Sequence, residues 1–116
     1  MDRKVIASFQ KALEAKHRQL RVSLAKAQRE ARGTQHDFGK DEGDRAVSST
    51  SREIDASQKS RDRALLTAVD AALKRIKDST FGACLNCGQE IGIKRLQAIP
   101  WVRYCIVCQE LMDKTR

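Results

Sequence analysis

Several kinds of residue that build broad globular cores are scarce in this sequence of 116 residues. Aromatic residues make up only 4% of it, and the only proline is Pro100. No apolar run approaches the roughly 20 residues needed to span a bilayer, and no apolar stretch of the signal-peptide type follows the basic start. We therefore expect a cytoplasmic protein without a membrane span, built from long two-faced helices rather than around a wide core.

Charged residues, in contrast, are abundant. They make up 33% of the chain, and the excess of Lys and Arg gives a formal net charge of +8. A basic surplus favours an acidic partner, which is either nucleic acid or a negatively charged protein surface. The charge is equally compatible with a chain that is only well solvated, so it does not by itself identify a partner.

Glycine marks the boundaries of the predicted elements. The six glycines fall into two clusters, within residues 33–43 and 82–92, whereas residues 1–32 and 44–80 contain neither glycine nor proline. Two long helices joined by a glycine-bearing turn, followed by a compact module richer in loops, are the simplest structure with this distribution.

These boundaries divide the chain into two predicted parts. Residues 1–80 are expected to form a helical hairpin, with one helix over about 2–32, a tip over about 33–45 and a second helix over about 46–79. Residues 81–116 are expected to form a separate C-terminal module. The predicted fold class is therefore mostly α.

The first predicted helix has the seven-residue period of a coiled coil. The two interleaved rows of its seam are Ile6, Leu13, Leu20 and Ala27, and Gln10, His17, Leu24 and Ala31. We interpret Gln10 and His17 as polar seam positions that set the register, rather than as ligands.

The second predicted helix also has one apolar stripe, which is strongest toward its C-terminal end. Its members are Val47, Ile54, Leu65, Val69, Ala72, Leu73 and Ile76. Because each helix has a single stripe, an antiparallel coiled-coil hairpin buries both stripes within one chain, and we expect a monomer. The alternative is a parallel coiled coil between chains, which a short turn makes less favourable.

Two Cys-x-x-Cys pairs, Cys84 with Cys87 and Cys105 with Cys108, are separated by seventeen residues. This spacing is typical of four-cysteine zinc sites, because two intervening residues let both sulfurs reach one ion at about 2.3 Å. In a reducing compartment four cysteines favour metal over disulfides, and the alternative is a set of buried dithiols or a redox pair. With four protein ligands the zinc ion has no open position for water, so we expect one structural Zn²⁺.

Apolar residues around the ligands are expected to form a small core for this module. They are Phe81, Ile91, Ile93, Leu96, Ile99, Trp101 and Ile106. The last stretch, from Cys105 to about Lys114, is predicted to be a short closing helix with Leu111 and Met112 facing inward. The sequence contains no convincing nucleophile–base arrangement, phosphate loop or open metal site, so we do not expect an enzyme.

The residues around the first cysteine pair resemble a known family. Residues 81–96, with Ala98 and Pro100, are similar to the zinc finger of DksA/TraR-type transcription factors. Residues 41–46 (Asp-Glu-Gly-Asp-Arg-Ala) resemble the tip of that family's hairpin, and residues 61–63 (Arg-Asp-Arg) resemble part of its second helix.

This resemblance implies a bacterial transcription regulator of the stringent-response type that binds RNA polymerase and not a specific DNA sequence. The family inserts its hairpin through the polymerase's secondary channel, where the tip changes the stability of promoter complexes. By carry-over, Asp41, Asp44 and Ala46 are the tip residues, and Arg61 belongs to the stretch that grips the channel rim.

Three alternatives remain open at this point. Asp41 or Asp44 could act only as a cap of the second helix, at the positive end of its dipole. The chain could be a bare coiled-coil adaptor. It could also bind nucleic acid directly, with Lys94, Arg95 and Arg103 neutralising phosphates.

The sequence departs from the family at positions that matter for the alarmone guanosine tetraphosphate. The basic residues that help to hold the alarmone in the family correspond here to Ala68, Ile99 and Gln109. None of these is charged, and a multiply charged phosphate ligand needs cationic donors. We therefore expect weak or absent synergy with the alarmone.

Overall fold

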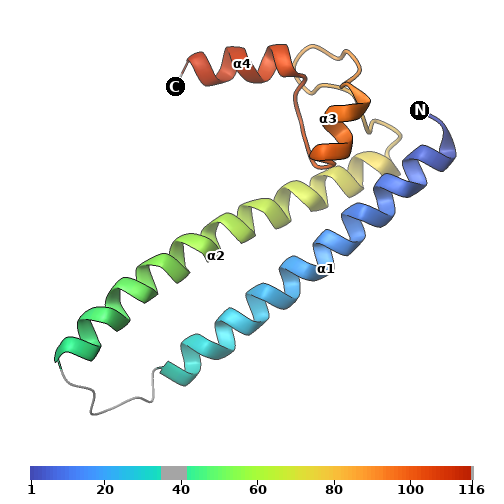
Figure 1. The fold of residues 1–116 in the computed structure, drawn as a ribbon. Helices are drawn as coiled ribbons and strands as arrows, with labels where there is room; N and C mark the ends of the chain where they lie inside the picture. Colours follow the sequence, from blue (N-terminus) through green and yellow to red (C-terminus); the bar gives the residue numbers. More distant parts are fainter. Residues whose placement is uncertain (35–41, 116) are drawn as a thin grey trace. The chain divides into compact units, whose positions relative to one another are not determined.

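Four α-helices make up most of the described structure (Figure 1). The computed structural model describes the backbone of residues 1–34 and 42–115, and the side chains of residues 1–29, 53–54 and 56–115. The helices are α1 (Arg3–Thr34), α2 (Glu42–Lys77), α3 (Ile93–Ala98) and α4 (Ile106–Lys114). None of the described helices has an apolar stretch long enough to cross a membrane.

The chain forms two compact units, each of which contains a part of α1 and a part of α2. The first unit consists of Met1–His17 and Thr67–Arg116, and the second of Arg18–Leu66. In both units the two helices run in opposite directions (Figure 1). This confirms the predicted antiparallel hairpin within one chain.

In the first unit, the side chains of His17 and Asp70 join the two helices. His17 Nε2 lies 2.7 Å from Asp70 Oδ1. In the second unit, Ser23 Oγ donates a hydrogen bond of 3.4 Å to Asp62 Oδ2. His17 therefore acts as a polar contact of the helix pair, as the heptad pattern indicates.

The buried face of α1 agrees with the predicted seam except near its N-terminal end. Leu13 and Leu20 are buried, but Phe9 is buried as well, with 5% of its surface exposed. Gln10, which we assigned to the seam, is exposed and donates a hydrogen bond to Glu14. That assignment was wrong because this end of α1 turns its apolar face toward the C-terminal module, which places Phe9 inside.

Among the side chains of α2 that the structure describes, the fully buried members of the apolar stripe lie toward the C-terminal end of the helix. Val69 and Ala72 are fully buried. Ile54 is 62% exposed, so its assignment to the buried stripe was wrong. The side chain of Val47 lies outside the described residues. Val69 and Ala72 belong to the first unit, whereas Ile54 belongs to the second.

A C-terminal cap ends α2 and directs the chain into the metal-binding module. The Thr80 N–H donates to the carbonyl of Arg75 at 2.8 Å, and the Ser79 N–H donates to the carbonyl of Ile76 at 3.2 Å. These two bonds form a Schellman motif, which requires a left-handed residue after the helix. Ser79 takes that conformation, with φ of 63°, at a position that glycine would occupy with less strain.

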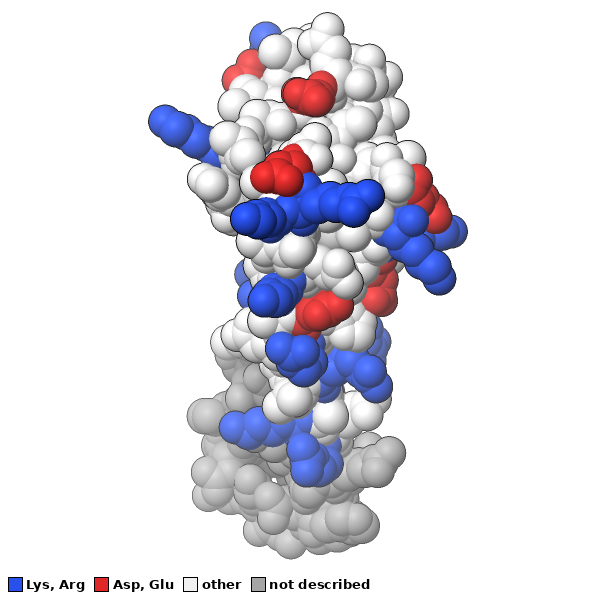
Figure 2. Space-filling model, turned by 90° about the vertical axis from the view of Figure 1, so that its right-hand side faces the viewer, with Lys and Arg blue, Asp and Glu red and all other residues white. Residues whose placement is uncertain are grey.

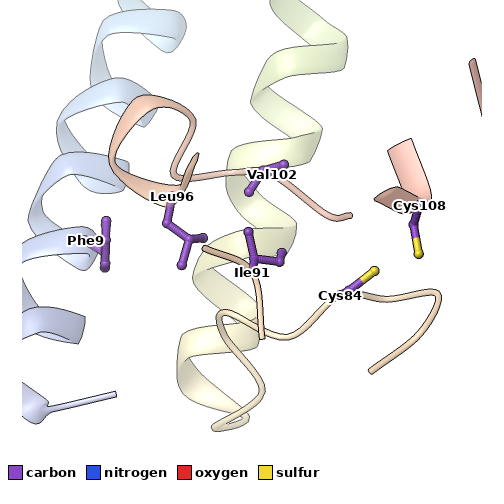
Figure 3. Packing of buried hydrophobic residues seen from close by; sticks show 6 residues of the cluster. All are labelled: Phe9, Cys84, Ile91, Leu96, Val102 and Cys108. Atoms are coloured by element: carbon purple, nitrogen blue, oxygen red, sulfur yellow. The ribbon is translucent and has the colours of Figure 1, made fainter. Parts of the chain in front are cut away.

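The core of the first unit combines apolar side chains with two cysteines (Figure 3). The buried cluster around the metal-binding module consists of Phe9, Cys84, Ile91, Leu96, Val102 and Cys108. Three residues assigned to this core, Ile93, Ile99 and Ile106, are instead exposed.

The predicted inward face of α4 was also partly wrong. Leu111 is 56% exposed, whereas Met112 is half-buried. Cys108 and Met112, four residues apart, share the inner face of the helix. Because the sulfur of Cys108 must reach the metal centre, Leu111 is turned away from the core.

Candidate metal centre and partner-contact residues

The four cysteine sulfurs converge at one point. The Sγ atoms of Cys84, Cys87, Cys105 and Cys108 all lie within 4.8 Å of one another. Those of Cys87 and Cys105 are 3.8 Å apart, and Cys84 and Cys108 point their sulfurs toward each other (Figure 3). A tetrahedral zinc ion with Zn–S distances of about 2.3 Å separates its sulfurs by about 3.8 Å, so this arrangement fits one ion.

A tight loop positions the first pair of cysteines. The Cys84 N–H donates to the carbonyl of Gln89 at 2.8 Å, and the Gly88 N–H donates to the carbonyl of Cys84 at 3.0 Å. Gly88 has φ of 77°, in the left-handed region that favours glycine. This loop turns the chain back on itself so that Cys84 and Cys87 face the same point.

The start of α4 positions the second pair. Cys105 is the N-cap residue, and Cys108 is in the first turn of the helix. Three residues apart at a helix start, the two side chains lie on the same side. The Leu85 N–H donates to the carbonyl of Arg103 at 2.9 Å, which holds the first loop against the segment before the second pair.

Hydrogen bonds prepare the sulfur of Cys84 for metal binding. Burial acts to raise the pKa of the Cys84 thiol, but backbone N–H groups of Cys87, Cys105 and Asn86 donate to its sulfur and lower the pKa to about 6. This thiol is therefore largely ionised near neutral pH, and the thiolate is the form that binds metal.

Cys108 differs from Cys84 in its protonation. The side-chain Nδ2 of Asn86 donates to its sulfur at 3.4 Å, which by itself lowers the pKa. The sulfur of Cys105, burial and the sulfurs of Cys84 and Cys87 act the other way, and the net pKa is raised to about 12. Four sulfurs this close cannot all be anionic without a cation, whereas one Zn²⁺ would offset two of the four negative charges.

Aromatic and cationic contacts tie the metal-binding module to the helices within the first unit. The rings of Phe9 and Phe81 are 5.5 Å apart between centroids, at an interplanar angle of 49°. Lys16 Nζ lies 5.8 Å from the centre of the Trp101 ring, in a cation–π geometry. Trp101 is half-buried, so much of its surface is used in packing.

Arginine side chains make further contacts around the module. Arg75 donates from Nη2 to the carbonyl of Val102 at 3.3 Å, and burial together with the charge of Arg103 lowers the pKa of Arg75. Arg95 Nε donates to the carbonyl of Tyr104 at 3.1 Å, and Arg103 lies over the Tyr104 ring at 5.3 Å. Arg95 and Arg103 thus contribute to packing, which weakens the alternative that they bind nucleic acid.

The four residues predicted to contact polymerase lie in two parts of the hairpin. Asp41 lies outside the described residues, and the side chains of Asp44 and Ala46, in α2, lie outside them too. Arg61 is on α2 with an exposed side chain. Sequence reasoning missed Phe9, which contributes to the module's core. Its signal in the sequence is the four-residue spacing from Val5 and from Leu13.

The described part of the second unit is strongly basic. Next to the residues drawn in grey, Figure 2 shows many Lys and Arg side chains and few Asp or Glu. Among the residues of this unit with described side chains, the cations are Arg18, Arg21, Lys26, Arg29, Lys59, Arg61 and Arg63. The acids with described side chains are Glu53 and Asp62. An acidic surface is therefore the complementary partner.

Comparison with known proteins agrees with this geometry. A family model described as the prokaryotic dksA/traR C4-type zinc finger matches residues 79–114. The RNA polymerase-binding transcription factor DksA of Escherichia coli (strain K12) is 33% identical over 113 residues, which are 97% of this chain and 74% of that protein. The DksA of Haemophilus influenzae is 32% identical, over 97% of this chain and 77% of its own length.

A solved structure extends this similarity to the fold. The transcription factor DksA2 from Pseudomonas aeruginosa is 27% identical and matches with a TM-score of 0.85, over 99% of this chain and 88% of that one. The fold and the four-cysteine centre define a helical hairpin protein with a C4-type zinc finger. The chain belongs to the DksA/TraR family. Its metal is one zinc ion, and its relatives are named as transcription factors, not enzymes, as expected.

Proposed function

We propose that this protein is a transcription regulator that binds RNA polymerase and changes the stability of promoter complexes. The observation that carries the proposal is its similarity, over 97% of its length, to a protein named as an RNA polymerase-binding transcription factor. The basic character of the described side chains within Arg18–Leu66 supports it, because a cationic surface accelerates association with an acidic protein. The zinc ion stabilises the C-terminal module that follows α2. Because its four ligands are all cysteines, it takes no part in a reaction.

In this proposal the hairpin enters the secondary channel of the polymerase. Asp41, Asp44 and Ala46 act at the tip, and Arg61 contacts the channel rim. The exposed side chain of Arg61 is accessible for such a contact. A carboxylate delivered near the catalytic magnesium shifts an isomerisation of the promoter complex only if it binds one of the two states more tightly.

The alarmone guanosine tetraphosphate is expected to add little. Of the three positions that correspond to its basic contacts, Ala68 and Gln109 are half-buried and Ile99 is 36% exposed. Gln109 donates its side-chain amide to Asp113 at 3.1 Å. None of the three side chains supplies a cation for a phosphate.

The lifetime of open complexes at a ribosomal RNA promoter tests this function, with purified RNA polymerase, zinc-loaded protein and no alarmone. We expect a marked shortening that Asp44→Asn abolishes while binding to polymerase is retained. Glu53→Gln is the matched control, because it removes one exposed carboxylate from the same helix, and it should behave as wild type. Equal activity of Asp44→Asn would refute the role of the tip. No effect and no polymerase binding by the wild type, with tight binding to duplex DNA, would favour direct nucleic-acid binding.

A further inference from the structure

A cavity of about 240 Å³ lies between α1 and α2 in the unit Arg18–Leu66. Residues spaced by three or four positions on each helix line it, so one face of each helix forms one wall. The lining includes Arg21, Leu24 and Gln28 of α1, and Lys59, Arg63 and Leu66 of α2.

The lining has a distinct chemistry. It contains three cationic side chains and one amide, and none of the described side chains that line it is acidic. The nearby carboxylate of Asp62 accepts a hydrogen bond from Ser23. Arg21 and Lys59 come from different helices, so an anion in the cavity meets a cation from each wall. Guanidinium and ammonium groups are the usual protein ligands of phosphate oxygens.

The cavity also has an apolar part. Leu24 and Leu66 are both half-buried and contribute apolar surface to the lining. A pocket that combines apolar walls with a few polar groups fits an organic ligand better than a bare inorganic ion. The complementary ligand therefore has an anionic end with more than one charge and a less polar organic end.

We propose that this cavity binds an organic phosphate with at least two negative charges, of the nucleoside diphosphate class. Arg21 and Lys59 contact the phosphate groups from opposite helices, and Leu24 and Leu66 contact the organic part. This site goes beyond the proposed function. It is built from residues other than the tip, the zinc ligands and Arg61.

Isothermal titration calorimetry of the full chain with adenosine diphosphate, pyrophosphate and adenosine tests the site. Measurements at an ionic strength of about 0.05 M keep the screening of exposed charges low. We expect adenosine diphosphate to bind most tightly, pyrophosphate more weakly and adenosine most weakly. The affinity for adenosine diphosphate should fall as the salt concentration rises. Because two charge-assisted contacts are lost, the Arg21→Gln/Lys59→Gln variant should bind adenosine diphosphate at least about tenfold more weakly.

The matched control is Arg18→Gln/Lys26→Gln. It removes one Arg and one Lys from the same unit, at exposed positions that do not line the cavity. It should change the affinity by less than about twofold, since only long-range charge is lost. Equal weakening in the two variants, adenosine binding as tightly as adenosine diphosphate, or no binding of adenosine diphosphate would each overturn the proposal. No polymerase is present, so failure here leaves the proposed function untouched.

Discussion

Replacement of Phe9 by Ala should strongly destabilise the zinc-binding unit. Phe9 is 5% exposed, belongs to the same buried cluster as Cys84 and Cys108, and packs against Phe81 in a tilted pair with 5.5 Å between the ring centroids. Truncation of a buried Phe to Ala costs about 3–5 kcal/mol, and an aromatic pair accounts for about 0.5–1.5 kcal/mol. Since domains are commonly stable by about 5–15 kcal/mol, the loss is a large fraction of the total.

Urea denaturation with zinc in excess measures this loss. The fluorescence of Trp101, the only tryptophan, reports on the unit that contains Phe9. Val22→Ala is the control on the same helix, because Val22 is 64% exposed, and it should change the free energy of unfolding by no more than about 0.5 kcal/mol. A double-mutant cycle with Phe81→Ala measures the interaction energy between the two rings. A loss of less than about 1 kcal/mol for Phe9→Ala would refute the packing argument.

Two further predictions concern the metal and the end of α2. Removal of zinc with a chelator should change the Trp101 fluorescence but leave most of the helical circular dichroism, because α1 and α2 contain 32 and 36 residues and α3 and α4 only 6 and 9; unchanged fluorescence would contradict a folding role for the metal. Ser79→Gly should raise the free energy of unfolding by about 0.5–1 kcal/mol, because it relieves the left-handed strain at the cost of a more flexible unfolded chain. Ser79→Ala, as the control, should show no such gain in the same urea titration.

The features that the sequence predicts well depend on local spacing. Leu13 and Leu20 follow from a seven-residue period, and both are buried. The metal centre follows from two cysteine pairs, because only a narrow set of spacings brings four sulfurs to one ion. In both cases the spacing of residues along the chain is enough to predict which side chains lie together.

The features that it predicts poorly depend on which surfaces meet in space. Phe9 is buried because the C-terminal module packs on α1, and the period of α1 alone does not encode that contact. Leu111 is exposed because Cys108 occupies the inner face of α4. The cavity beside Arg21 and Lys59 depends on the register between two helices, which small changes in side-chain size along both of them decide.

The position of the cysteines explains how a chain with so few aromatic residues stabilises its C-terminal module. Two of the six buried residues of that core, Cys84 and Cys108, are ligands of the metal centre. A small domain buries too little apolar surface to be stable by that means alone. Zinc binding therefore supplies part of the stabilisation, as in zinc fingers that fold only with metal. The residues proposed to act on polymerase and phosphate lie instead within Arg18–Leu66, a unit that contains none of the four cysteine ligands. Substitutions at Asp44, Arg21 or Lys59 should consequently leave zinc affinity unchanged, and a loss of zinc in any of these variants would contradict this division.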